Sequence, residues 1–390
     1  MDLPEELVIN IIARLPMKSL ARFKSVYREW KPFTESKYFR HLYHSNTSST
    51  SCSNWSILRR DVGSRRSGLE EVKLDLPRES RHGNTSFASC FTLNTKNIKI
   101  KEIRVAACTD GLVLLRLELD DMTIRYDIGN PVLQQWIQLP PPPIPRGSSH
   151  YNYNDSGLVT RMHNHTLLGY KVVLIHREFR SFPTYRFFIF SSDTVEWSLQ
   201  VHSCPGPSTN VTSRTSNPVS LNGKLHWLDL SGHITVHDFF SNDDQVRAIS
   251  LPAKMQGSPR PSGMMVYTTS QGSFVLIDVE FMEDVTKSYN VRIWRLKCDS
   301  WSWEKAWDIN LACVGLGRSC VPMAINVFDI DIIYLWDFHN KCFLACNLRT
   351  NTKSYGARKD GYAIFFERWW CLSQFVPSLQ VVPTLEPKLI

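Results

Sequence analysis

The stretch FIFSSDTVEW (Phe188 to Trp197) reads as a β-strand, a polar turn and then a tryptophan. The same order recurs in YDIGNPVLQQW, which ends at Trp136, in IWRLKCDSWSW, which contains Trp301, and in LACNLRTNTKSYG, which contains Tyr355. These aromatic residues are 61, 104 and 54 residues apart (136 to 197, 197 to 301 and 301 to 355), and VHDFFSNDDQVRAISLP lies near the middle of the long interval without a tryptophan. A period of roughly 50 to 60 residues is typical of a four-stranded propeller blade of the kelch type. We expect five such units, with the aromatic residues in the blade cores. A sixth could form from residues 55 to 100 with the C-terminal strand.

Short segments rich in β-branched and aromatic residues extend this pattern from about residue 87 to the C-terminus. They are GLVLLRLEL (Gly111 to Leu119), YKVVLIHRE (Tyr170 to Glu178), YRFFIFSS (Tyr185 to Ser192), GSFVLIDVEF (Gly272 to Phe281) and YNVRIWRL (Tyr289 to Leu296). Asp-Gly and Asn-Gly pairs separate several of the strands, as expected of tight hairpins. These features predict a sandwich, a barrel or a propeller, and the repeat favours the propeller.

The first 43 residues follow a helical period instead. Leu7, Ile11 and Leu15 recur at steps of four, with Asp2 as the expected N-cap, Pro4 in the first turn and Pro16 ending the helix. Further helices are expected from Ser19 to about Trp30 and from Ser36 to Tyr43. A unit this small buries little surface alone. It is therefore either a subdomain packed on the rest of the chain or a docking module whose apolar face belongs to a partner.

The pattern Leu3-Pro4-x-Glu6-Leu7-Val8-x-x-Ile11-x-x-x-Leu15-Pro16-x-Lys18-Ser19-Leu20-x-Arg22-Phe23-Lys24-x-Val26-x-x-x-Trp30 resembles the F-box in the form common in plants. Tyr27 departs from it, since that family usually has a cysteine at this position. The resemblance implies binding to a Skp-type adaptor and, through it, to a cullin–RING ubiquitin ligase. By position, it implies that the adaptor faces Leu3, Pro4, Leu7, Ile11, Leu15 and Pro16, and that Leu20, Val26 and Trp30 form or support that surface.

Residues 100 to 380 resemble the F-box-associated interaction domain of plant F-box proteins. The matching segments are Cys108 to Val113, Asn130-Pro131 with Trp136 and Leu139 to Pro143, Leu168 to Tyr170, Ser220 to Trp227, Ile293-Trp294 with Trp303, and Phe375 to Leu379. The expected organisation is a helical F-box (1–44), a flexible linker (45–56) and a propeller-like substrate-recognition domain (57–385). The fold class is thus α+β multidomain, with a small helical F-box followed by a large all-β domain.

Enzymatic and metal-binding motifs are missing from the sequence, so we expect no catalytic residue, no metal site and no cofactor. His163-x-His165 and the Asp337/His339 pair offer suitable side chains. The first is better explained as a solvated turn, and the second has no nucleophile or positioning group beside it. The Leu139–Pro143 segment is better explained as a stiff connector between blades than as a polyproline ligand.

The charge and hydropathy of the sequence limit the classes of partner and the compartment that we expect. The net charge is +8, yet no block of five basic residues occurs, so a nucleic-acid-binding tail is not expected. Runs of about 18 apolar residues are also lacking, so we expect no membrane span. The N-terminus is acidic where a secretory signal would be basic, which favours the cytoplasm or the nucleus.

These expectations combine into one leading hypothesis: a non-catalytic substrate receptor of a Skp–cullin–F-box ubiquitin ligase with an unknown target protein. Target contacts are expected from the long connections at Pro145 to His165 and Ser203 to Asn217. One alternative is a propeller lectin or enzyme with an incidental helical leader. Another is an F-box protein that binds the adaptor but acts outside ubiquitination.

Overall fold

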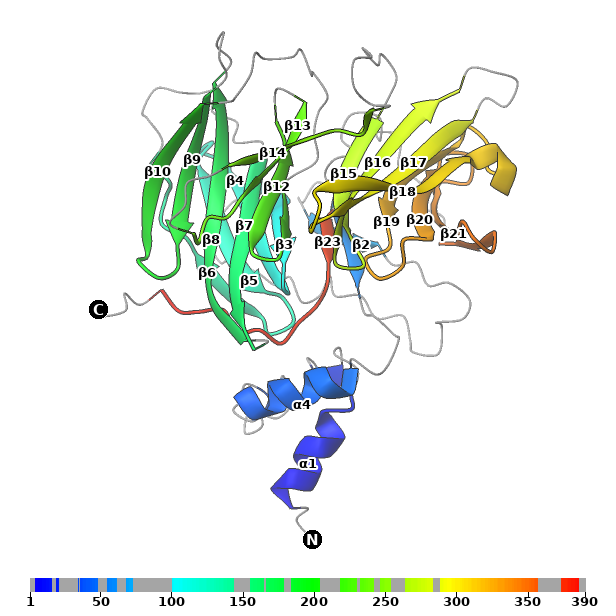
Figure 1. Cartoon of the computed structure of the whole chain (residues 1–390). Helices are drawn as coiled ribbons and strands as arrows, with labels where there is room; N and C mark the ends of the chain where they lie inside the picture. Colours follow the sequence, from blue (N-terminus) through cyan, green and yellow to red (C-terminus); the bar gives the residue numbers. More distant parts are fainter. Residues whose placement is uncertain are drawn as a thin grey trace.

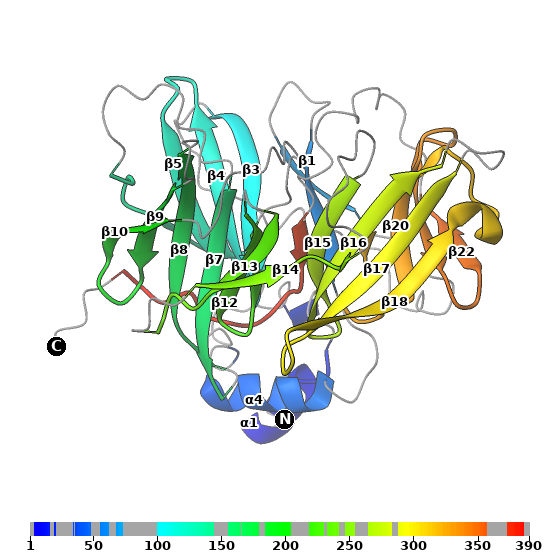
Figure 2. The same cartoon turned by 45° about the horizontal axis from the view of Figure 1, so that its top comes forward.

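The strands of the computed structural model are arranged as a ring of sheets, with the labelled helices α1 and α4 at one end of the ring (Figures 1 and 2). The structure describes residues 4–15, 19–20, 34, 36–47, 55–61, 68–72, 100–143, 155–164, 166–178, 184–203, 218–229, 232–241, 246–253, 264–282, 288–356 and 373–385. Within these ranges, none of the helices is long and apolar enough to cross a membrane.

Five sheets have four antiparallel strands each, joined in sequence order, as the repeat predicts. The first is β3 (Ile100–Thr109), β4 (Leu112–Leu119), β5 (Ile124–Asn130) and β6 (Gln135–Gln138); the second is β7 (Asp155–His163), β8 (Thr166–Glu178), β9 (Thr184–Ser191) and β10 (Glu196–Ser203). The third is β11 (Val219–Leu221), β12 (Lys224–Leu228), β13 (His233–His237) and β14 (Arg247–Ser250); the fourth is β15 (Met264–Ser270), β16 (Ser273–Phe281), β17 (Tyr289–Lys297) and β18 (Ser302–Asn310). The fifth is β19 (Cys320–Ile325), β20 (Ile332–Asp337), β21 (Cys342–Asn347) and β22 (Thr352–Tyr355), preceded by the 3-10 helix η4 (Leu311–Val314). A propeller with five four-stranded blades follows from this order.

A sixth sheet joins the two ends of the β-rich region. Strand β1 (Ser56–Asp61) pairs with β2 (Gly68–Val72) on one side and with β23 (Ser373–Phe375) on the other, all antiparallel. The Gln374 side chain in β23 donates a 2.8 Å hydrogen bond to the backbone oxygen of Ile325 in β19. On the opposite side, Phe375 packs in one apolar cluster with Val113 of β4. The C-terminal strand therefore lies between the first and the last four-stranded blade and joins a three-stranded sheet with residues 56–72, while residues 73–99 lie outside the described residues.

Tight two-residue turns join the first and second strands of three blades. Their central residues are Asp110-Gly111 (φ 47° and 78°), Asn222-Gly223 (φ 50° and 73°) and Gln271-Gly272 (φ 49° and 67°). Positive φ at both positions identifies type I′ turns, for which Asp-Gly and Asn-Gly are favoured. The predicted hairpins are confirmed, and these turns lie at one end of the ring.

Trp136, Trp197 and Trp303 are the second residues of the fourth strands β6, β10 and β18, and the last two tie neighbouring blades together, whereas Trp301 lies in the turn before β18. The Trp197 indole on β10 donates to the Pro140 backbone oxygen at 2.9 Å, and the Trp303 indole on β18 donates to the Ser250 backbone oxygen at 2.8 Å. The prediction that Tyr355 lies in a blade core was wrong. The equivalent register position in β22 holds Lys353, because Tyr355 lies two residues further along the strand, where it is 56% exposed.

Helices α1 (Glu5–Ile12) and α4 (Lys37–Thr47) pack against each other and against the first blade. Pro4 is the N-cap of α1 and provides no side-chain cap, so the helix begins two residues later than predicted; Asp2 lies outside the described residues. The helix ends at Ile12, short of Pro16. Phe39 and Tyr43 of α4 are buried, which confirms the third predicted helix, although α4 continues to Thr47.

Candidate functional site

Helix α1 has one buried and one exposed apolar face. Ile12 and the following Ala13 are buried, and Val8 and Ile9 pack against the same cluster. Leu7 and Ile11 are one helical turn apart and are 52% and 56% exposed. The helix thus packs Val8, Ile9 and Ile12 on the protein and presents Leu7 and Ile11 to solvent.

The remaining predicted adaptor-binding residues divide into three groups. Pro4 is exposed beside Leu7, and Leu15 is half-buried against the core cluster. Leu20 is completely buried, so it can support the exposed face but cannot contact a partner directly. Leu3, Pro16, Val26 and Trp30 lie outside the described residues.

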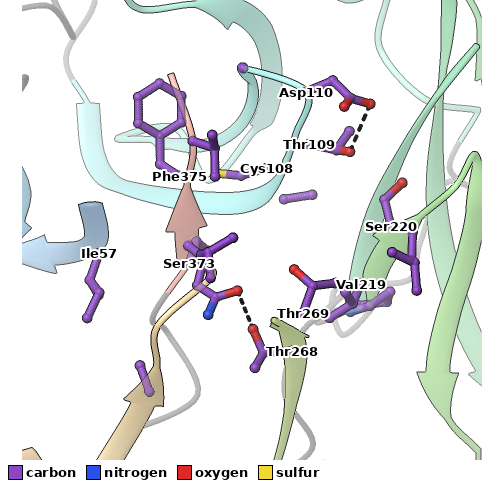
Figure 3. Close-up of a pocket in the computed structure, with 18 of the residues that line it drawn as sticks. Ile57, Cys108, Thr109, Asp110, Val219, Ser220, Thr268, Thr269, Ser373 and Phe375 are labelled. Atoms are coloured by element: carbon purple, nitrogen blue, oxygen red, sulfur yellow. Dashed lines mark hydrogen bonds between the residues drawn. The ribbon is translucent and has the colours of Figure 1, made fainter. Parts of the chain in front are cut away.

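A cavity of about 480 Å³ lies at the centre of the ring, bordered by the first strands of the blades (Figure 3). Hydroxyl side chains line it from four sheets: Thr109 on β3, Ser220 on β11, Thr269 on β15 and Ser373 on β23. Thr268 donates a 2.5 Å hydrogen bond to the side-chain oxygen of Gln374 across the same space. A cavity of this volume, with hydroxyls set in a largely apolar wall, falls in the size range of small-molecule sites.

The turn-bearing end of the ring holds the C-terminal segment that follows β23, drawn in red in Figures 1 and 2. The Asn130 amide donates to the backbone oxygens of Ser378 and Gln380 at 2.9 and 2.7 Å. Gln380 in turn accepts a 3.0 Å hydrogen bond from the Leu167 backbone nitrogen in the second blade. These contacts fix the segment across the first two blades. The sequence shows the FVPSL stretch but does not indicate this course.

The acid and base side chains singled out from the sequence have structural roles. The Asp337 carboxylate accepts hydrogen bonds from the backbone nitrogens of His339 and Asn340 in the β20–β21 turn. Asp229 accepts from the His233 backbone nitrogen and the Thr235 hydroxyl in the same way. Both carboxylates thus stabilise the turns in which they lie. The described residues also contain no group of three metal-ligating side chains.

Buried titratable groups in the blades behave as core residues. Burial lowers the pKa of His226 to about 4, and its ring stacks on Phe274 at a centroid separation of 5.2 Å. Burial raises the pKa of the Cys108 thiol beside the cavity, so the thiol is un-ionised and unreactive at neutral pH.

The prediction that Pro145 to His165 is one long connection was wrong in part. Asp155–His163 forms strand β7, because Leu158 and Val159 pack into the core clusters on its two faces, and His163 ends that strand exposed to solvent. Residues 144–154 and 204–217, which make up most of the predicted connections, lie outside the described residues, as does His165. The target-contact prediction for these segments stays a prediction.

Two family models match the chain. The F-box domain matches residues 1–42, and the family described as "F-box protein At3g26010-like, beta-propeller" matches residues 53–375. The chain is 33% identical to At3g23950 of Arabidopsis thaliana, a relative named for its F-box, over 99% of this chain and 95% of that protein. It is also 33% identical to F-box protein At3g26010 of the same plant, over 87% of this chain and 76% of that protein. The chain belongs to the family of plant F-box proteins with a C-terminal β-propeller.

Proposed function

We propose that this protein is the substrate receptor of a Skp–cullin–F-box ubiquitin ligase. The exposed Leu7 and Ile11 on α1 carry this proposal, since they lie in the segment that matches the F-box model. F-box domains generally bind Skp1-type adaptors. An apolar pair left half-exposed on an otherwise packed helix supports the same use here.

The energetics suit a docking face. Burying an exposed leucine or isoleucine completely contributes about 1.5–3 kcal/mol, and roughly half of each side chain is still available for burial. The adaptor would therefore gain binding free energy from residues that contribute little to the folded chain by itself. Pro4 adds a rigid exposed position beside them.

The propeller would present the target to the ligase. This chain makes and breaks no bond in the proposed function, because its role is to hold target lysines near the ubiquitin-carrying subunit and raise their effective concentration. The adaptor and cullin would place the complex in the cytoplasm or the nucleus. Turn contacts that occupy the Asp337 and Asp229 carboxylates agree with a non-catalytic role.

Co-purification with a Skp1-type adaptor and a cullin tests the proposal. The Leu7→Ala/Ile11→Ala variant should bind the adaptor at least about tenfold more weakly, because two apolar contacts are truncated. Leu199→Ala/Val201→Ala on β10 is the matched control, since these residues are 51% and 57% exposed but lie in the second blade. Equal adaptor binding by all three proteins would reject α1 as the docking face. Adaptor binding without cullin recruitment would favour a function outside ubiquitination.

A further inference from the structure

The central cavity has one charged group at its edge. Asp110 is the only charged side chain among the described residues that line the cavity, in a protein of net charge +8. Its carboxylate oxygen Oδ2 accepts hydrogen bonds from the hydroxyls of Thr160 and, at 3.4 Å, Thr109. Lysine, arginine and histidine residues of the described ranges form no ion pair with it, and its second oxygen accepts no hydrogen bond from them. A carboxylate has about four acceptor sites, so Asp110 can still bind a cation.

The cavity wall also contains hydroxyls without partners. Ser373 on β23 is only 9% exposed, lines the cavity, and has no hydrogen-bond partner among the described residues. The hydroxyls of Ser220 and Thr269 are likewise unpaired within the described part of the chain. Polar groups buried in a native structure are normally hydrogen-bonded. The Ser373 hydroxyl lines the cavity, so a ligand or solvent there can complete its hydrogen bonds.

We propose that the central cavity binds an organic cation, a guanidinium or an alkylammonium group, with Asp110 as its counter-ion. Such a group carries several N–H donors, which suit the Asp110 carboxylate, while the hydroxyls of Ser220, Thr269 and Ser373 make other parts of the cavity wall polar. A bare metal ion suits the site less well, because it needs several carboxylate or imidazole ligands close together. The cation can come from a free small molecule or from a lysine or arginine side chain of a bound protein. Neither source requires the adaptor.

The turn geometry allows substitutions that change the charge at the cavity without changing the backbone. Asp110 occupies the first central position of its type I′ turn, where φ is positive and asparagine is also favoured, so Asp110→Asn removes the charge and keeps the turn. Asn222 occupies the same position in the β11–β12 turn and also lines the cavity, so Asn222→Asp adds a second carboxylate. Asp121→Asn is the charge-matched control. Asp121 lies in the β4–β5 connection, outside the cavity lining, and its side chain contacts only the nearby Thr123.

Titration calorimetry on the full chain tests the proposal with three probes: agmatine, a capped Gly-Gly-Arg-Gly-Gly peptide and the same peptide with citrulline. We expect a cationic probe to bind and the citrulline peptide to bind at least about fivefold more weakly. High salt should lower the affinity for the cationic probe. Asp110→Asn should lower affinity about fivefold, Asn222→Asp should raise it, and Asp121→Asn should leave it unchanged.

The source of the cation follows from the two cationic probes. Agmatine binding as tightly as the arginine peptide indicates a small-molecule ligand, and binding of the peptide alone indicates a protein side chain. The proposal is overturned if neither cation binds, if citrulline binds equally well, or if Asp110→Asn has no effect. Asn222→Asp keeps the test decisive even if Asp110→Asn does not fold. Cation binding that persists in Leu7→Ala/Ile11→Ala separates this site from the adaptor face.

Discussion

The propeller and the N-terminal helices satisfy their apolar surfaces in different ways. The ring closes on itself, because β23 from the C-terminus pairs with β1, and the largest side chains of the blades, such as Trp227 and Trp336, are fully buried. Helix α1 instead leaves Leu7 and Ile11 more than half exposed. The ring also exposes apolar side chains, at Leu199 and Val201, so it is the position of Leu7 and Ile11 in the F-box match that distinguishes the helix face. Mutations in the core of the ring should accordingly reduce the stability of the protein, whereas mutations of Leu7 and Ile11 on α1 should reduce adaptor binding.

The largest expected effect is in the blade core. Trp227→Ala should lower the free energy of unfolding by about 3–5 kcal/mol, because it empties a fully buried site packed edge-on against Phe187 at 5.6 Å. Trp303→Ala should cost less, since Trp303 is only half-buried and mainly ties its blade to Ser250. Urea denaturation measures both. Equal costs would mean that the tryptophan repeat, rather than burial, determines the contribution.

The buried His226 should make the ring sensitive to acid. Its pKa is about 4 in the folded protein and about 6.5 when unfolded, so the unfolded chain binds the proton more readily. The stability contributed by neutral His226 is complete above pH 6.5 and is lost as the pH falls toward 4, by about 3 kcal/mol in total. Denaturation curves at several pH values measure this loss. The His226→Gln variant should show a smaller loss over the same range, and an unchanged slope would contradict the assignment.

Substitutions at two glycines test how firmly the C-terminal segment packs against the β3–β4 turn. Gly111 and Gly272 both have positive φ, so alanine at either should cost about 1–2 kcal/mol. A Cβ at Gly272 would meet nothing within 4 Å, whereas at Gly111 it would lie 2.8 Å from the Ser378 backbone nitrogen. Gly111→Ala should therefore be the more damaging, as thermal unfolding can show. Equal melting temperatures for the two variants would indicate that the Ser378 segment moves aside easily.

The blades were the most predictable part of the molecule. Strands β4, β8, β9, β16 and β17 coincide with the β-rich stretches to within a few residues, because short apolar runs bounded by turn residues leave a local signature. The burial of Tyr355 was predicted wrongly, because sequence spacing does not reveal a shift of two residues in register. The second half of the predicted Pro145 to His165 loop misled because polar residues at both ends of β7 mask its apolar centre.

The candidate sites were predictable only where they are local. Leu7 and Ile11 could be placed on one helical face from their spacing alone, and the structure leaves both exposed. The central cavity could not be predicted, because Asp110, Ser220, Thr269 and Ser373 come from four sheets that only the closed ring brings together. Leu20 shows the same limit, since its burial depends on packing against distant residues.

Hydrogen exchange with and without a Skp1-type adaptor tests the central claim most directly, namely that α1 is completed by a partner whereas the ring is complete alone. The account predicts added protection in residues 4–15 on adaptor binding, with the exchange of the blade strands unchanged. The Leu199→Ala/Val201→Ala protein should show the same protection, and Leu7→Ala/Ile11→Ala should show little. Protection that appears in the blades and not in α1 would contradict the account.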